Sequence, residues 1–290
     1  IVPILFLALD CSSVGAKEIQ LAAPFTDNMI LQRERAVPVW GSDAPGSEVT
    51  VEFAGQVKVA KADDKGDWML RLDPLEASLT ERVFRVRNNR GQSHDLEGVL
   101  VGEVWFSSGQ SNMVWTAGKS MCRDLASDLS RAEKEVPIRE ININTVSALY
   151  PQKKATSEQG WKKVKEAGGF SALSLSFAHE LYRELQVPIG ILLSAHSNTR
   201  IEAFTQRQAI ESHPGLSDDK NLIHDADPLT EQGRRAFEQY YADLKAWQEI
   251  AGDAAERGGK VPGRPKLPGI AGMWRGPSQF FNGKIAPVIP

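Results

Sequence analysis

The stretch GVLVGEVWFSSGQSNM, residues 98 to 113, joins an apolar run to a polar one. Residues 98–106 are almost continuously apolar, which is typical of a strand in a parallel sheet covered on both faces. Three serines, one glycine and two carboxamide side chains then follow within residues 107–112. Polar residues after a strand often form only a surface turn. The alternative is that the strand end serves as a rigid platform for a reactive hydroxyl.

The segments that follow predict a strand, a helix and a further strand. REININT (139–145) reads as a strand, FSALSLSFAHELYRELQ (170–186) as a helix, and VPIGILLSAHSN (187–198) as a strand with a polar end. In the helix an apolar stripe recurs every four residues, with Ala178 beside it: Leu173, Phe177, Leu181 and Leu185. A strand, helix, strand order implies a right-handed crossover and parallel strands. The polar clusters 107–112 and 194–198 then share the sheet edge where ligands bind, which favours a functional site.

The preceding part of the chain has a different pattern. Short strand-like runs separated by turn signals span residues 36–41, 48–55, 57–62, 67–72 and 82–89. Val49, Val51 and Phe53 alternate with polar residues, as in a strand with one buried face. We therefore predict an antiparallel β-sandwich over 17–97, followed by an α/β domain over 98–290. Trp40 and Trp68 in the sandwich are more consistent with core residues than with a binding surface.

The first residues are consistent with a processed leader. Ile1–Leu9 is apolar but too short to span a bilayer, and Val14-Gly15-Ala16 has the small residues of a cleavage site. We expect a partial signal peptide over 1–16 and a periplasmic or secreted protein; a first buried strand is the alternative. Cleavage would leave Cys122 as the only cysteine, which excludes an intramolecular disulfide.

Composition limits the classes of partner. The chain has 290 residues and a net charge of -3, and no run of Lys or Arg is long enough to suggest a nucleic-acid groove. We therefore expect no nucleic-acid partner, and no membrane partner for the mature form. The five histidines are scattered, and no Cys/His cluster has metal-ligand spacing. We expect neither a metal nor a cofactor.

Four segments together carry a family resemblance. They are DNMILQRERAVPVWGSDAPGSEVTVEFAG (27–55), VGEVWFSSGQSNM (101–113), GFSALSLSFAHELYRELQVPIGILLSAHSNTRIEAF (169–204) and FFNGKIAPVIP (280–290). The sequence resembles the bacterial sialate O-acetylesterases, which are carbohydrate esterases of the SGNH-hydrolase type. The resemblance implies an incomplete three-layer α/β/α parallel sheet behind the sandwich. It also implies a serine esterase that removes O-acetyl groups from sialic acid or another acetylated glycan.

By this resemblance Ser111 is the nucleophile. The oxyanion hole would consist of the Ser111 amide and amides at Ser197 and Asn198, while Gly109, Gln110 and Asn112 would support the turn. The residues themselves agree, because a serine between a strand and a helix exposes its hydroxyl at the sheet edge. Its own amide would lie at a helix N-terminus, where free donors and the dipole favour an oxyanion.

The second segment departs from the family pattern. Two glycines usually follow an aromatic residue there, whereas this chain has His196-Ser197-Asn198. A positive φ at this turn would favour glycine, although asparagine tolerates left-handed geometry better than most residues. His196 occupies the aromatic position of the pattern; a role as general base is the alternative.

The family's third segment and its Asp-x-x-His do not occur before Pro290. We therefore expect the chain to be C-terminally truncated and impaired as an esterase for lack of the base histidine. Two other readings stay open: a non-catalytic carbohydrate-binding module on an esterase scaffold, and a structural module of a larger exported protein.

Overall fold

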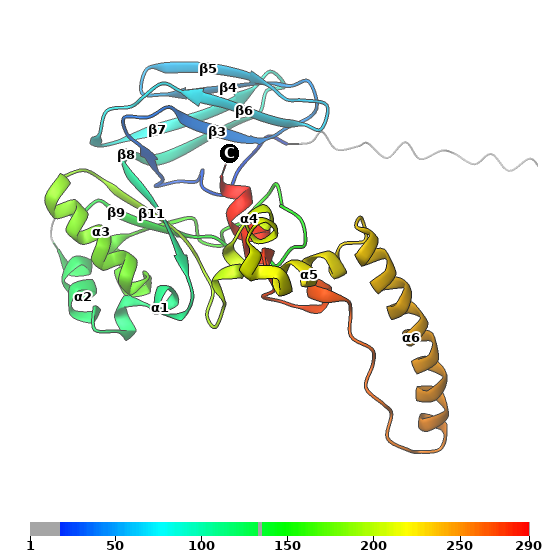
Figure 1. Cartoon of the computed structure of the whole chain (residues 1–290). Helices are drawn as coiled ribbons and strands as arrows, with labels where there is room; N and C mark the ends of the chain where they lie inside the picture. Colours follow the sequence, from blue (N-terminus) through cyan, green and yellow to red (C-terminus); the bar gives the residue numbers. More distant parts are fainter. Residues whose placement is uncertain (1–17, 133–134, 290) are drawn as a thin grey trace, which may run out of the picture.

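The computed structural model describes residues 18–132 and 135–289. In Figure 1 a β-sandwich lies above a part with parallel strands and helices, and a long helix projects from the body. The predicted signal peptide over 1–16 lies outside the described residues. Within them, no helix is both long enough and apolar enough to cross a membrane.

Two packed sheets form the sandwich. One sheet has the order β1 (Gln20–Leu21), β3 (Val37–Ser42) and β6 (Asp67–Leu72). The other contains β4 (Glu48–Phe53), β5 (Gln56–Lys61), β7 (Ser78–Asn88) and the first part of β8 (Ser93–Gly109). The predicted alternation is confirmed, since Val49, Val51 and Phe53 are buried with less buried residues between them. Trp68 is a core residue, and Trp40 is half-buried with its ring edge-on to Phe25.

The 17-residue strand β8 is shared by both parts of the fold. Its first part pairs with β7, while residues 103–109 pair in parallel with β11 (Ile189–Ala195). The sheet continues to β9 (Ile138–Asn142), parallel to β11, and to β10 (Trp161–Lys163), which is antiparallel; β2 (Ile30–Gln32) also pairs with β8. The predicted parallel arrangement is confirmed. The predicted domain boundary at residues 97/98 falls inside β8, so one continuous strand carries the sandwich into the site.

Helices cover one face of the parallel strands. They are α1 (Ser111–Val114), α2 (Arg123–Arg131) and α3 (Ala172–Leu185). Ile189 and Ile191 of β11 share a buried cluster with α2 and α3, whereas the next residue, Leu192, packs into the cluster of the sandwich core and Val288. Helices and sandwich thus hold β11 from opposite faces.

The predicted apolar stripe of α3 is mostly wrong: Ala178 is buried and Leu181 packs against the core cluster, but the other three side chains are exposed. The buried residues of the helix are Ala172, Ser174, Leu175 and Ala178. Leu173 and Phe177 are exposed, and the Phe177 ring lies 5.1 Å from the exposed Trp105 ring. The helix lies close to the sheet through small side chains, a choice that a hydrophobicity pattern does not reveal.

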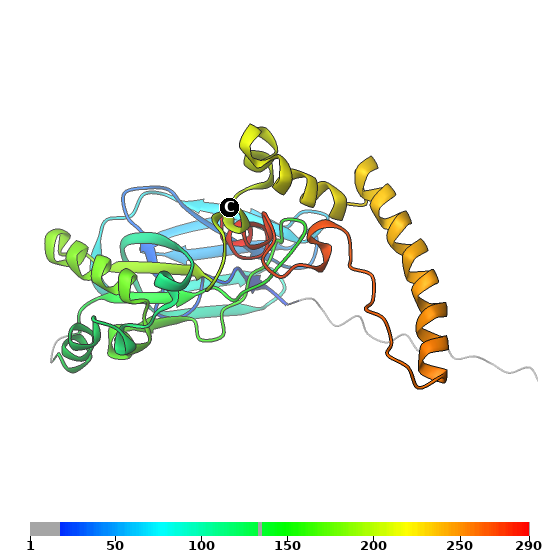
Figure 2. The same ribbon diagram turned by 60° about the horizontal axis from the view of Figure 1, so that its bottom comes forward.

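The remaining chain forms a helical excursion and then returns to the sheet. It contains α4 (Arg207–Ser212), α5 (Ser217–Ala226) and α6 (Glu231–Glu256). Figure 2 shows α6 standing away from the body, with the chain running back beside it. Short helical turns are Ala117–Lys119, Val164–Gly169, Ile201–Phe204, Pro214–Leu216, Gly269–Gly272, Phe281–Ile285 and Ala286–Val288. The last two bring the chain back to the end of β11.

Candidate active site

The turn after β8 requires glycine at position 109. Gly109 has a φ of +142°, which side-chain-bearing residues rarely adopt. A Cβ at this position would lie 2.9 Å from Cγ of Met113. The backbone therefore turns sharply here, and Ser111 follows as the first residue of α1.

Ser111 is half-exposed, as predicted for a hydroxyl at the open edge of the sheet. Its Oγ donates to Oε1 of Gln110 at 3.0 Å. It also accepts a hydrogen bond from the backbone N–H of Asn198 at 3.3 Å. The two polar clusters, separated by more than eighty residues in sequence, thus meet at this hydroxyl.

The second turn follows β11 and has the conformation expected for asparagine. Asn198 has a φ of +53°, in the left-handed region. Nη1 of Arg275 donates to the Asn198 carbonyl at 2.7 Å, and the Ser197 carbonyl lies 3.4 Å from the same nitrogen. The guanidinium therefore fixes the turn from its carbonyl side, while the Asn198 amide faces Ser111.

The predicted oxyanion donors differ in their availability. The Ser111 amide donates to Oε1 of Gln110 at 3.1 Å, so Gln110 must move before that amide can bind an oxyanion. The Asn198 amide is already directed at the nucleophile. Ser197 is exposed. Helix α1 is a single turn, so its dipole adds little.

Two other serines of the first cluster support the turn. Ser108 Oγ donates to the Ser194 carbonyl at 2.8 Å, which ties the end of β8 to β11. Ser107 Oγ accepts from Oγ of Ser174 in α3 at 3.0 Å. Gln110 caps α1, and Asn112 is exposed. Within the cluster, Ser111 is thus the serine that meets the second turn.

His196 packs beside the site. Its ring centroid lies 5.0 Å from that of Phe280, edge to face, and its amide donates to the Gly109 carbonyl. Burial lowers the pKa of His196, and the positive charges of Lys284 and Arg275 lower it further. The described residues show no hydrogen bond between this ring and Ser111.

Lys284 is a buried cation that sequence patterns did not single out. The side chain is 1% exposed, and Nζ donates to the Ala195 carbonyl and to Oγ1 of Thr145, both at 2.9 Å. Burial lowers the pKa of Lys284 to about 8. The available signal was a lysine inside the apolar run FFNGKIAPVIP. It places positive charge directly behind the second turn.

Glu140 on β9 is another buried ionisable group near the parallel strands. Its carboxylate accepts from the Ser171 amide at the start of α3, at 3.1 Å. Burial raises the pKa of Glu140 to about 7, and the Ser171 hydrogen bond opposes that rise. At 3% exposure Glu140 is covered and cannot meet a substrate.

No general base contacts Ser111 within the part of the chain that the structure describes. The partners of its Oγ are Gln110 and the Asn198 amide. Neither of these groups accepts a proton readily. In residues 18–132 and 135–289, no three His, Cys, Asp or Glu side chains are grouped to hold a metal ion.

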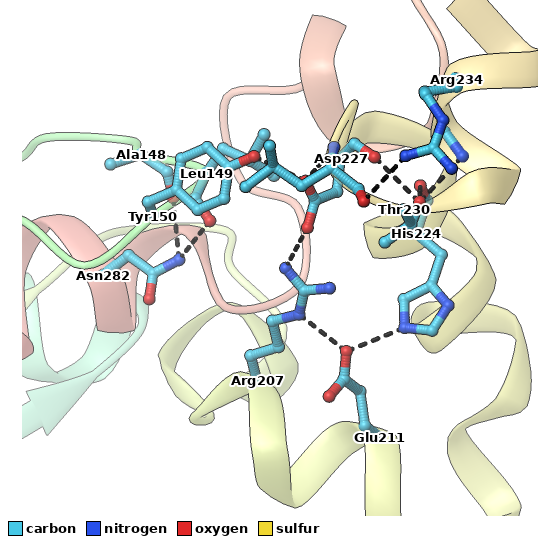
Figure 3. Close-up of polar contacts among 12 residues, drawn as sticks. Ala148, Leu149, Tyr150, Arg207, Glu211, His224, Asp227, Thr230, Arg234 and Asn282 are labelled. Atoms are coloured by element: carbon cyan, nitrogen blue, oxygen red, sulfur yellow. Dashed lines mark hydrogen bonds and ion pairs between the residues drawn. The ribbon is translucent and has the colours of Figure 1, made fainter.

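A second set of ionisable groups lies in the helical excursion (Figure 3). His224 meets Glu211 at 2.8 Å; Arg207 bridges Glu211 and Asp227; and Tyr150 donates to Asp227 at 2.6 Å. Burial, together with the hydrogen bond to Asp227, raises the pKa of Tyr150 to about 12. These bonds join α4 and α5 to residues 148–150, which indicates a structural role.

A large cavity lies away from both turns. Its volume is about 940 Å³, and it opens between the sandwich and residues 152–156. Its wall includes Phe25, Trp40, Trp68 and Pro287, and none of residues 107–113 or 194–198. Geometry at the strand ends, rather than cavity size, therefore identifies the candidate site.

Comparisons with known proteins agree on one kind of relative. The sialate O-acetylesterase of Mus musculus is 29% identical over 211 residues, covering 66% of this chain and 38% of the relative. The Homo sapiens sialate O-acetylesterase is 28% identical over 232 residues, covering 73% of this chain and 43% of the relative. A solved carbohydrate acetylesterase of Xanthomonas citri is 31% identical, with a TM-score of 0.61 over 68% of this chain and 44% of its own. No protein-family model matches, and the chain spans about two fifths of the length of these relatives.

Proposed function

Since this chain belongs to the sialate O-acetylesterase family, we propose that it carries the nucleophile of a serine carbohydrate esterase. Its substrate would be an O-acetyl ester on sialic acid or another glycan. The observation that carries the proposal is the meeting of Ser111 Oγ with the Asn198 amide at the ends of two parallel strands.

The proposed reaction is a two-step acyl transfer. Ser111 Oγ attacks the acetyl carbonyl and loses its proton to a base, and the sugar hydroxyl leaves with a proton. The amides of Asn198 and Ser197 support the negative charge on the carbonyl oxygen. The Ser111 amide joins them once the Gln110 side chain moves. Water then releases acetate and restores the serine.

We further propose that these 290 residues hydrolyse esters weakly. A serine without a base is a poor nucleophile, and loss of the base histidine of a catalytic triad costs about 10⁶-fold in rate. The described residues put no histidine or carboxylate against Ser111. The same observation supports the second candidate, a carbohydrate-binding module on an esterase scaffold.

A fluorophosphonate probe distinguishes these functions. We expect slow labelling at Ser111 that added imidazole accelerates, because imidazole can act as the base. Ser111→Ala should abolish labelling without unfolding the protein, whereas Ser107→Ala should retain it. Intact-mass and peptide analysis report the labelled residue. Labelling that persists in Ser111→Ala would rule out Ser111 as the nucleophile. No labelling of wild type, even with imidazole, would favour the binding module.

Acetate release tests the missing base separately. Hydrolysis of an activated acetate ester by the 290-residue chain should be slow and should depend on Ser111. Rapid Ser111-dependent turnover without imidazole would contradict the proposal that Ser111 lacks a base in these 290 residues.

We also propose that the protein is exported to the periplasm or secreted. We propose separately that residues 17–97 form a sandwich domain in front of an esterase domain over 98–290. Edman sequencing of the exported protein, beginning at Lys17, would support cleavage after Ala16.

A further inference from the structure

Arg275 presents an incompletely used guanidinium at the second turn, whose Asn198 amide meets Ser111 Oγ. Its recorded hydrogen bonds go through Nη1 to the carbonyls of Ser197 and Asn198, and the residue is exposed. Guanidinium has five N–H donors in a planar fork that matches a carboxylate. Within the described residues, Nε and Nη2 of Arg275 have no hydrogen-bond partner, so one edge of the fork is free to bind a ligand.

The charge around the second turn, residues 196–198, is positive. Lys284 lies buried behind the turn and contacts no carboxylate in the described part of the chain. The acidic side chains that follow the turn, Glu202 and Asp219, pair with Arg200 instead of Arg275. An anion would therefore bind Arg275 without displacing a carboxylate in the described part of the chain, and the buried Lys284 adds positive charge from behind the turn.

One exposed aromatic residue adjoins Arg275 in sequence, and another ends the helix of Ser111. Trp274, next to Arg275, is 55% exposed and lies 6.4 Å from the Phe280 ring, which in turn contacts His196. Trp115 closes α1 through a hydrogen bond from its amide to the Ser111 carbonyl and is 64% exposed. Exposed indole rings can pack against the apolar face of a sugar ring. The surroundings thus fit a carbohydrate that also carries a negative charge.

We propose that Arg275 is a specificity-determining residue that binds the carboxylate of an acidic sugar while the acetyl ester meets Ser111. This inference rests on the proposed function and narrows its substrate class to sugars that bear a carboxylate. Arg275 holds the ligand through its free edge and holds the Asn198 turn through Nη1. Sialic acids and hexuronic acids are sugars that carry such a carboxylate.

Calorimetric binding to the 290-residue chain tests the proposal without needing turnover. The probes are methyl N-acetylneuraminoside, methyl glucuronoside and the carboxyl methyl ester of each. We expect the acids to bind at least about tenfold more tightly than their esters. A tenfold ratio corresponds to the lower end of the contribution of one hydrogen bond to a charged group. Binding of the sialoside alone would identify sialic acid as the ligand, and binding of both acids would identify acidic sugars in general.

Variants separate ligand binding from support of the turn. Arg275→Gln should remove the preference for acid over ester, and Arg275→Lys should keep part of it, because lysine retains charge without the fork. Arg200→Gln removes an equal charge close to the second turn, two residues after Asn198, and should leave the preference intact. A purely structural Arg275 would instead weaken acid and ester equally.

The outcomes also distinguish this inference from the proposed function. Equal binding of acid and ester by wild type, or no binding of either acid, would overturn the role of Arg275 even if Ser111 is labelled. An Arg275-dependent preference without labelling of Ser111 would instead support a binding module for acidic sugars.

Discussion

Both turns of the candidate site contain a residue with positive φ, but the residue is glycine in the first turn and asparagine in the second. Each follows a strand of the same parallel pair, and Ala195 lies opposite Gly109 in register. The first turn has glycine at φ +142°, where a Cβ would collide with Met113. The second has asparagine at φ +53°, exposed to solvent. Glycine is needed where space is missing, whereas asparagine suffices where only the backbone conformation is unusual.

The two turns also differ in what supports them. The first is tied to β11 by a neutral hydroxyl, Ser108, which donates to the Ser194 carbonyl. The second lies between two cations, with Arg275 on its exposed carbonyls and Lys284 on the Ala195 carbonyl below. Charge at the second turn is consistent with a site that holds negative charge there.

The largest effect is expected at the first turn. Gly109→Ala should cost about 4 kcal/mol of folding free energy, from strain at positive φ together with the collision with Met113. It should also slow labelling of Ser111 by about 100-fold, because a misplacement of about 1 Å has that effect on a catalytic group. Denaturant unfolding and probe kinetics measure the two effects.

Gly252→Ala in α6 is the matched control. A Cβ there meets nothing within 4 Å, so the change should stabilise the protein by about 1 kcal/mol through helix propensity. Similar effects of the two substitutions would show that the first turn does not require glycine.

The next largest effect concerns the charge beneath the second turn. The pKa of Lys284 is about 8 in the folded protein, against an ordinary value of 10.5. Between these pH values the unfolded chain binds more protons, so the stability of wild type should rise with pH, by at most about 3 kcal/mol. Lys284→Met should remove this rise.

The same variant tests the charge seen by His196. Loss of the Lys284 cation should raise the pKa of His196, measurable by nuclear magnetic resonance of the ring protons. Equal pH dependence of stability in Lys284→Met and wild type would show that burial does not lower the pKa of this amine.

At the second turn itself the effect should be smaller. Asn198→Val should destabilise the protein by about 1–2 kcal/mol and slow Ser111 labelling about tenfold, because a β-branched residue resists positive φ. Asn198→Gly should change stability by less than about 1 kcal/mol, since glycine accepts this φ but adds freedom to the unfolded chain. Equal behaviour of the two variants would mean that backbone conformation does not decide the residue at 198.

Much of this arrangement follows from local sequence patterns. Alternation at Val49, Val51 and Phe53 predicted the sandwich strands, and the apolar runs before residues 107 and 196 predicted the parallel pair. The positive φ at Asn198 is a conformation that asparagine tolerates better than most residues. These features depend on neighbours in sequence or on one residue's own preferences.

The rest depends on tertiary contacts that no local pattern contains. The buried face of α3 is lined by Ala172 and Ala178, because the helix approaches the sheet closely, so the larger Leu173 and Phe177 face outwards. The positions of Lys284 and Arg275 depend on the chain returning to β11 after the α6 excursion. Only the fold shows that these cations surround the turn.

The smallest predicted effect concerns the hydroxyl that links the two turns. Ser108→Ala removes the hydrogen bond to the Ser194 carbonyl and should cost about 1 kcal/mol, the net value of a typical intramolecular bond. Ser111 labelling should fall only a few-fold, because the Asn198 amide and Gly109 still position the hydroxyl. Labelling as slow as in Gly109→Ala would mean that the neutral link, rather than the glycine, fixes the first turn, and the contrast between the turns would fail.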